Sequence, residues 1–182
     1  MIDGVTNMRD NQRPFAADPI RYGYRPTPTG LAVIAVSRRG VAAVLLGADR
    51  HEMSRKLAEA LAGADLLEDE TAIGAVLDAV ASHLDKPTEE PGFDLDLRGD
   101  ARELAVWAAL RAIPIGETRT YGALAKAIRA GFTAQEVGAA CAANRLAVVV
   151  PCHRVLKADG SISGYRWGVH RKLRLLAMEK AA

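Results

Sequence analysis

The spacing of apolar residues changes near Asp100, and this change constrains the fold more than any other feature of the chain. Before it lie three short, partly alternating apolar runs separated by turn-forming residues, at 20–25, 31–37 and 41–46. This pattern predicts an antiparallel meander. Helical spacing follows at 52–61 and 71–84, and the period-two alternation of 93–97 predicts a short last strand.

From Asp100 onward the spacing is helical. Asp100 and Glu103 predict a helix start, and an apolar stripe runs from there to Ile113. Thr120 can cap a second helix, and the capping box at 133–136 predicts a third helix that continues through Ala143. Gly131 lies between these two helices, where a left-handed cap is expected. Two short helices joined by a tight turn predict a helix-turn-helix.

These elements predict an α/β chain of the α+β type with three parts. Residues 1–18 are expected to form a mobile leader. Residues 19–98 predict a small lobe of antiparallel sheet and helices with a structural role. Residues 99–182 predict a mainly helical lobe that contains the helix-turn-helix and the chemistry.

Charge is distributed unevenly along the chain. Residues 1–100 hold 11 Lys and Arg against 17 Asp and Glu, a net charge of −6, whereas residues 101–182 hold 13 against 5, a net charge of +8. A cationic half indicates a polyanionic partner, with nucleic acid the leading candidate. Chance segregation of charge between two lobes explains the same numbers equally well.

Cysteine and histidine usage argues against a metal site. The two cysteines and four scattered histidines lack the spacing of a zinc site, so we expect neither metal nor cofactor. No apolar run approaches the length of a membrane span, and the N-terminus lacks the apolar core of a signal peptide. We therefore expect a cytoplasmic protein with reduced thiols and no membrane partner.

The second cysteine stands at a forced break in the chain. The apolar run 147–150, which predicts a buried strand, is followed by Pro151, Cys152, His153, Arg154 and Val155. Proline ends regular pairing, and the two neighbours on the C-terminal side carry or can carry positive charge, which favours a thiolate. An inert buried thiol is the more common outcome for a lone cysteine after a valine run.

The residues around Cys152, taken in order, resemble the O6-alkylguanine-DNA alkyltransferase family. The resemblance rests on Pro151–Val155 together with Asn144 upstream and the Ser-Gly-Tyr-Arg-Trp-Gly segment 163–168 downstream. It is strongest to the C-terminal part of bacterial adaptive-response (Ada) proteins and extends clearly from about Asp96 to Glu179. It implies DNA repair by one stoichiometric, irreversible transfer of the alkyl group from O6-alkylguanine, and from O4-alkylthymine, to the cysteine.

The resemblance also implies the roles of the catalytic residues. Cys152 is the acceptor thiolate, His153 acts as a base through a water molecule, and Glu179 holds the imidazole. From the sequence alone Asp159 competes for the role of that acid. Asn144 orients the cysteine and ends a helix, and Tyr165, beyond a hairpin expected at 159–160, donates a hydrogen bond to the flipped guanine.

A second group of residues is implied to contact double-stranded DNA. Tyr121 rotates the target phosphate so that the base leaves the duplex, and Gln135 stands at the start of a recognition helix seated in the minor groove. Small residues on that helix permit close approach, although packing against a neighbouring helix explains them equally well. The remaining implied contacts come from Ala134, Gly138, Ala139, Arg154 and Arg166.

The chain departs from the family pattern at three positions. Gln135 replaces the usual Arg that fills the gap left by the flipped base, which leaves the efficiency of flipping open. Ala147 and Trp167 differ from the mammalian branch and indicate a pocket that prefers methyl to benzyl adducts; packing is the alternative role for Trp167. Cysteines for the zinc-bound upstream domain of Ada proteins are absent, so we expect the guanine-repair portion, as a fragment or a free-standing protein.

Two other functions compete with repair. A module that recognises alkylated DNA without repairing it would carry a bulky residue in place of Cys152. A helix-turn-helix transcription regulator would need a dimerisation element, and none is evident, so we expect a monomer. The motif around Cys152 favours the transferase over both.

Overall fold

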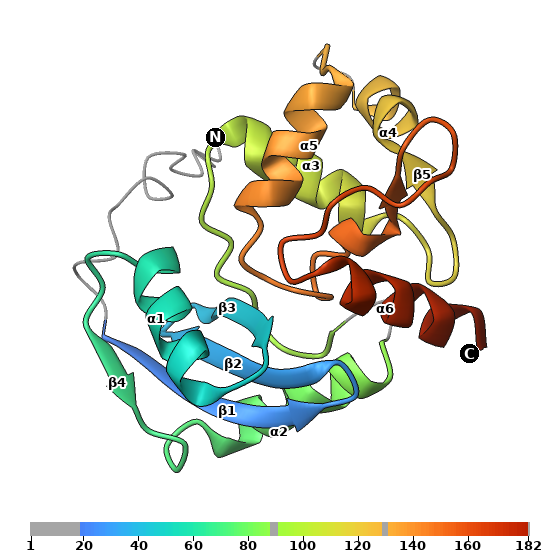
Figure 1. Ribbon diagram of the computed structural model, residues 1–182. Helices are drawn as coiled ribbons and strands as arrows, with labels where there is room; N and C mark the ends of the chain where they lie inside the picture. The colour runs from blue at the N-terminus through green and yellow to red at the C-terminus, as the bar shows by residue number, and fades with distance from the viewer. Residues whose placement is uncertain (1–18, 88–90, 129–130, 182) are drawn as a thin grey trace, which may run out of the picture.

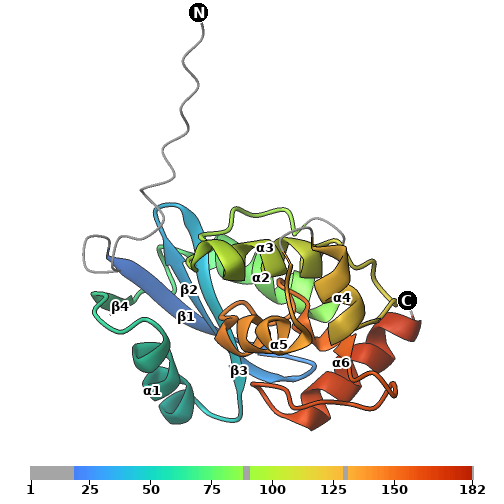
Figure 2. The same ribbon diagram turned by 90° about the horizontal axis from the view of Figure 1, so that it is seen from above.

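The computed structural model describes residues 19–87, 91–128 and 131–181 (Figures 1 and 2). A sheet flanked by helices is built from the first half of the chain, and helices joined by long loops build the second half. The predicted α+β class is confirmed. The predicted leader, residues 1–18, lies outside the described residues. Within the described residues, no helix is long and apolar enough to cross a membrane.

The sheet begins with the predicted meander. Its strands are β1 (Ile20–Thr27), β2 (Gly30–Ser37), β3 (Gly40–Gly47) and β4 (Leu66–Glu68), in the order β3-β2-β1-β4. β1, β2 and β3 pair antiparallel, and β4, which the sequence analysis did not predict, pairs parallel with β1. Gly30 and Gly40 follow the two tight turns with φ of +120° and +133°, a region that side chains disfavour.

Two helices cover opposite faces of this sheet. On β1 the hydroxyl of Tyr24 bonds Ser54 of α1 (Arg50–Ala60), whereas a Cβ added at the preceding residue, Gly23, would lie 2.6 Å from Leu77 of α2 (Gly74–Asp85). Since successive residues of a strand point to opposite faces, α1 and α2 enclose the sheet between them. Burial on both faces explains why β3 is a continuous apolar run and does not alternate.

The free edge of β3 is where the two halves of the chain meet. Leu95 bridges Val41 and Leu146 bridges Val44, each as an isolated parallel pair. The short strand predicted at 93–97 is therefore wrong as a strand, because only one residue of the run pairs with the sheet. The segment instead passes along β3 as a connector toward the helical half.

The helical half contains the predicted helix pair. Its elements are α3 (Ala101–Arg111), β5 (Arg119–Thr120), α4 (Tyr121–Ala127), α5 (Ala134–Ala143), β6 (Val155–Leu156) and α6 (Val169–Ala181). The capping boxes Asp100–Glu103 and Thr133–Glu136 are both formed. Gly131 has the left-handed φ expected of it, +65°, but α4 ends at Ala127, so Gly131 does not cap that helix.

Two predicted strand-like segments prove to be turns. The buried run 147–150 folds back on itself, with Val149 N–H donating to Ala147 O at 2.8 Å and Val150 N–H donating to Leu146 O at 2.9 Å. Val148 has a φ of +69°, a strained value for a β-branched residue. The hairpin predicted at 159–160 is only a turn, because β6 pairs parallel with β5 and has no antiparallel partner after the turn.

Candidate active site

Cys152 opens a short 3₁₀ helix, Cys152–Arg154, directly after Pro151. Its side chain is buried, and Asn144 Nδ2 donates to its Sγ at 3.3 Å. Burial raises the pKa of the Cys152 thiol to about 11, and the bond from Asn144 and the charge of Lys172 lower it only in part. Burial thus opposes the thiolate that the neighbouring residues favour, and the role of Cys152 as the acceptor stays a prediction.

Asn144 fulfils both roles that the sequence analysis considered. It is the C-cap of α5, where Leu146 N–H donates to its Oδ1 at 2.8 Å. Its Nδ2 donates to Val150 O at 2.9 Å as well as to the cysteine sulfur. One fully buried amide thus ties the end of α5, the 147–150 turn and Cys152 together.

A buried carboxylate supports the residue after the cysteine. Glu179 Oε1 lies 2.8 Å from His153 Nε2, and the His153 side chain is completely buried. Burial alone would raise the pKa of Glu179, but hydrogen bonds from His153 and Arg154 hold it down to about 2. Burial lowers the pKa of His153 more than Glu179 raises it, so the imidazole is neutral.

This pairing fixes the tautomer of His153. An ionised Glu179 only accepts, so Nε2 carries the hydrogen and Nδ1 keeps its lone pair. Nδ1 is buried and has no hydrogen-bond partner among the described protein atoms. The imidazole therefore presents one free basic nitrogen on the residue adjacent to the thiol. Asp159, the competing acid, lies in an exposed turn and bonds Ser161.

Arg154 does not reach the molecular surface. Its guanidinium is buried, with Nε and Nη2 donating to Glu179 and Nη1 donating to Ile113 O at 2.6 Å. Its expected contact with DNA is wrong, because all of these donors are directed inward.

A pocket of about 330 Å³ opens on the cysteine. It lies between α5 and the segment that precedes α6, and its lining residues are Tyr121, Gly138, Cys141, Ala142, Cys152, Gly164, Tyr165 and Arg166. Five of these are predicted site residues, which the fold brings together from distant positions. Cys141 was not predicted; burial raises the pKa of its thiol well above the ordinary range, so it is the less reactive of the two cysteines.

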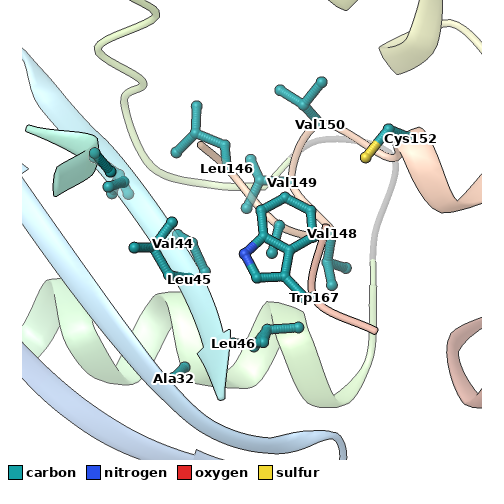
Figure 3. Close-up of a cluster of buried hydrophobic side chains, with 14 of the residues drawn as sticks. Ala32, Val44, Leu45, Leu46, Leu146, Val148, Val149, Val150, Cys152 and Trp167 are labelled. Atoms are coloured by element: carbon teal, nitrogen blue, oxygen red, sulfur yellow. The ribbon is translucent and has the colours of Figure 1, made fainter. Parts of the chain in front are cut away.

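Tyr165 and Trp167 form an aromatic wall beside the pocket. The Tyr165 ring contacts His153 and Trp167 edge to face, with centroid distances of 6.5 and 5.1 Å. Its hydroxyl is buried and has no hydrogen-bond partner in the part of the chain that the structure describes, and burial raises its pKa well above the ordinary value, so it keeps its hydrogen to donate. The Trp167 indole lies between Val44–Leu46 of β3 and the buried 146–149 segment (Figure 3).

Arg166 fastens this wall to α5. Its Nη1 donates to Ala142 O at 2.9 Å and to Asn144 O at 3.2 Å, at the C-terminal end of the helix. The side chain is exposed at the mouth of the pocket. Arg166 thus links the segment that carries Tyr165 and Trp167 to α5, and its exposed side chain can also bind an anion at the mouth of the pocket.

The other predicted DNA contacts occupy one side of the helix pair. Gln135 and Ala134 are exposed in the first turn of α5, Ala139 is exposed one turn later, and Gly138 lines the pocket. The alternative role for the small residues also holds in part, because Trp107 Nε1 of α3 donates to Ala140 O at 2.9 Å. Close packing on α3 and an open outer face therefore coexist on α5.

Sequence reasoning missed two polar residues beside the pocket, Ser163 and Lys172. Lys172 is completely buried and donates to Val155 O at 2.6 Å and to Ser163 Oγ at 3.1 Å. A signal for Lys172 exists, because it shares one helix face with Leu175 and Glu179 at spacings of three and four residues. Ser163 opens the segment 163–168 that carries the resemblance, but the sequence does not indicate its partners, because they come from distant elements.

Among the residues that the structure describes, no cluster of three or more His, Cys, Asp or Glu side chains could hold a metal ion. The site brings together a buried thiol, a neutral imidazole held by a carboxylate, and a phenol that has no hydrogen-bond partner among the described residues. This set suits a proton-coupled transfer to sulfur.

Comparison with known proteins places this arrangement in a family. Residues 101–181 match the model described as "6-O-methylguanine DNA methyltransferase, DNA binding domain". The bifunctional transcriptional activator/DNA repair enzyme Ada of Escherichia coli is 40% identical over 160 residues, 88% of this chain but only 45% of that protein. The chain thus spans less than half the length of this relative.

Two further relatives are covered more completely. The methylated-DNA–protein-cysteine methyltransferase of Mycolicibacterium paratuberculosis is 42% identical over 62% of this chain and 68% of that protein. The crystal structure of Mycobacterium tuberculosis OGT in complex with DNA superposes with a TM-score of 0.71 at 32% identity, covering 90% of this chain and 93% of that one. The chain belongs to the O6-methylguanine-DNA methyltransferase family.

Proposed function

We propose that this protein repairs DNA by transferring the alkyl group of O6-alkylguanine, and of O4-alkylthymine, to Cys152 in a single turnover. The observation that carries the proposal is the pocket of about 330 Å³, which is lined by Cys152 and by Tyr165, and the Tyr165 hydroxyl is buried with no hydrogen-bond partner among the described residues. A buried donor without a partner calls for a ligand acceptor, and a purine base offers one. The named activity of the relatives supports the same reaction.

The reaction balances with the groups of the site. The thiol proton of Cys152 passes to His153 Nδ1 through a water molecule, and the Sγ–C bond forms as the C–O6 bond breaks. Electrons of the broken bond go to guanine, whose developing negative charge Tyr165 stabilises by hydrogen bonding. The proton taken up by His153 then passes through water to guanine, so that both the imidazole and the base end neutral. The products are unmodified guanine and an S-alkyl thioether, which no group in the site can cleave.

His153 and Glu179 make this proton transfer possible despite the raised pKa of the thiol. The neutral imidazole is ready to accept, and the ionised Glu179 stabilises the imidazolium that results. Transfer of the proton to His153 is expected only as the alkyl carbon engages the sulfur. Irreversible use of Cys152 follows, since the carbon–sulfur bond of a thioether is stable and the thiolate is a poor leaving group from it.

The DNA is proposed to lie across the outer face of α4 and α5. Gln135, Ala134 and Ala139 are exposed there, and Tyr121 and Arg166 border the mouth of the pocket. The small side chains of α5 suit close approach to the minor groove, and the damaged base leaves the duplex to reach the buried sulfur. Residues 99–182 would form the alkyltransferase domain, residues 19–98 its structural support, and the protein would act as a monomer.

One mass measurement tests the proposal. We expect equimolar duplex DNA with one O6-methylguanine to add one methyl mass to the peptide that contains Cys152, with a yield of one per protein. Cys152→Ala removes the added mass, whereas the matched variant Cys141→Ala retains it. Binding of the duplex without a mass gain would instead favour a recognition module. A cytoplasmic location, at the nucleoid when DNA is bound, also remains a prediction.

A further inference from the structure

The pocket that opens on Cys152 has a positive border. Among its described lining residues only Arg166 carries a charge, and the rest are neutral side chains and glycines. No carboxylate lines this pocket within the part of the chain that the structure describes. A space bordered by a cation and by no acid favours a ligand that carries negative charge.

The hydrogen bonds of Arg166 leave one edge of its guanidinium open. Nη1 donates to Ala142 O at 2.9 Å and to Asn144 O at 3.2 Å, which uses both hydrogens of that nitrogen. Within the described residues, Nε and Nη2 have no acceptor and no carboxylate pairs with the guanidinium. The Nε and Nη2 hydrogens on this edge form a fork that matches the two oxygens of a carboxylate.

The guanidinium is held in place without a ligand. The residues on either side of Arg166 pack against each other, because the rings of Tyr165 and Trp167 lie 5.1 Å apart between centroids, and Trp167 is buried against β3 (Figure 3). Nη1 is bonded to carbonyls at the C-terminal end of α5, where the helix dipole favours a cation. A side chain ordered in advance loses little further freedom when it binds.

The charge of Arg166 acts on the reacting sulfur. Burial raises the pKa of the Cys152 thiol, and the charge of Arg166 is among the effects that lower it. Burial and the charge of Arg145 lower the pKa of Arg166, whereas negative charge on Cys152 raises it. Since Cys152 and Arg166 also line one small pocket, a single bound group can contact both of them.

We propose that Arg166 binds a carboxylate on the alkyl group itself, so that the protein accepts O6-carboxyalkylguanines, with O6-carboxymethylguanine the smallest, as a further class of substrate. The inference rests on the proposed function, because the same sulfur attacks the carbon bonded to O6. The Sγ–C bond forms, the C–O6 bond breaks with its electron pair going to guanine, and the thiol proton follows the route of methyl transfer. The products are guanine and S-carboxymethylcysteine.

The pocket would disfavour this adduct without Arg166. Removing a carboxylate from water is costly unless it is paired and hydrogen-bonded. The carboxylate would also lie near a sulfur that gains negative charge as it attacks, and like charges repel. Bidentate pairing with Arg166 offsets both effects, so this side chain determines specificity according to the charge of the adduct.

A DNA phosphate offers anionic oxygens to the same fork, and a comparison of adducts separates the two anions. Single-turnover transfer is measured on matched duplexes that carry O6-carboxymethylguanine or its neutral analogue of similar size, O6-carbamoylmethylguanine. The mass of the Cys152 peptide reports each rate, and the ratio of the two rates is compared between variants. Loss of a phosphate contact slows both adducts alike and leaves this ratio unchanged.

We expect Arg166→Gln to lower the carboxymethyl-to-carbamoylmethyl ratio about tenfold or more, the scale of hydrogen bonds to a charged group. Arg166→Lys keeps the charge without the fork and should recover part of the ratio. Arg174→Gln is the matched control, because Arg174 is exposed on α6 and does not line the pocket. Its ratio should equal that of the wild type.

The outcomes separate this inference from the proposed function. Equal slowing of both adducts in Arg166→Gln would mean that the residue acts through the loop or a phosphate alone, and would overturn the inference. An equal fall of the ratio in Arg174→Gln, or no carboxymethyl transfer by a wild type that transfers methyl, would overturn it as well. Absence of methyl transfer by the wild type would instead reject the proposed function. Melting curves confirm that the compared variants are folded at the assay temperature.

Discussion

Glu179 is the residue on which the buried polar groups of the site converge. It accepts hydrogen bonds from His153 and Arg154, and its side chain is only 1% exposed. The carboxylate therefore has two separable roles: it stabilises the fold by neutralising Arg154, and it sets the tautomer of His153. Because both partners are buried, removal of its charge leaves an unpaired guanidinium in the protein interior.

We predict that Glu179→Gln lowers the free energy of unfolding by about 3–5 kcal/mol at pH 7, the usual cost of breaking a buried ion pair. The pKa of Glu179 in the folded protein, about 2, lies below the ordinary value of 4.5 for a glutamate. The stabilisation by the charge is therefore fully present above pH 4.5 and is lost as the pH falls through about 2. Denaturant unfolding of both proteins from pH 7 to pH 2 should show the difference in stability narrowing in that window.

Loss of methyl transfer should accompany this destabilisation. Glu179→Gln is expected to slow single-turnover transfer by at least about 100-fold, in the range of general acid–base contributions. Asp159→Asn provides the matched control, because Asp159 is exposed and contacts only its own turn. A difference in stability that stays constant down to pH 2 would contradict the assigned charge of Glu179.

At the scale of elements, α5 shows how one helix can present two faces. Its inner side packs on α3 through Ala140 and Trp107, and its outer side exposes Gln135 in the first turn. The Thr133–Glu136 capping box fixes the start of the helix, so residue 135 is held at a defined position without taking part in the cap. A substitution there changes what the helix offers to a partner and leaves its packing intact.

We predict that Gln135→Arg raises the repair rate on duplex DNA, because a guanidinium can replace the flipped base in the stack and also adds charge toward the phosphates. Stability should change by no more than about 0.5 kcal/mol, as is usual for an exposed site. Single-turnover rates on O6-methylguanine duplexes measure the effect, with Gln135→Ala as the control that removes the side chain without adding charge. Equal or slower transfer by the Arg variant would reject this role for residue 135.

Elements specified by local chemistry could be predicted from the sequence. The three strands of the meander follow from apolar runs between turn residues, and α3 and α5 follow from their capping boxes. The 147–150 run was predicted as a strand because valine runs are ambiguous; the side chain of Asn144 and the backbone of Leu146 instead close it as a turn. β4 was missed because its three residues pair with the distant β1.

The site shows the same division between local and distant signals. The residues next to Cys152 could be identified as site residues from the sequence, because their order along the chain carries the resemblance. The inward direction of Arg154 and the burial of Lys172 could not, because both depend on how α6 packs on the 3₁₀ helix that follows Pro151. The raised pKa of Cys152 could not be predicted for the same reason. The charges of neighbouring residues are visible in the sequence, but the burial that raises this pKa depends on the whole fold.

Across the whole molecule, an aromatic contact links the sheet to the chemistry. Trp167 is 4% exposed and packs against β3 (Figure 3). Its ring also contacts the Tyr165 ring, which in turn contacts His153. The sheet thus supports the pocket wall through one indole. Removal of this side chain would free space behind Tyr165 and weaken the contact between the two halves of the chain.

We therefore predict that Trp167→Ala raises the ratio of the transfer rate for O6-benzylguanine to that for O6-methylguanine. Without the indole, Tyr165 can move into the vacated space and the pocket can accept the larger adduct. The same change should lower the free energy of unfolding by about 3–5 kcal/mol, the cost of truncating a buried tryptophan. Met53→Ala is the matched control: Met53 is fully buried between α1 and the sheet, so it loses core packing without touching the pocket. The benzyl-to-methyl ratio should rise for Trp167→Ala alone. A similar rise in Met53→Ala would mean that general loosening of the sheet, and not the indole, sets the size of the pocket.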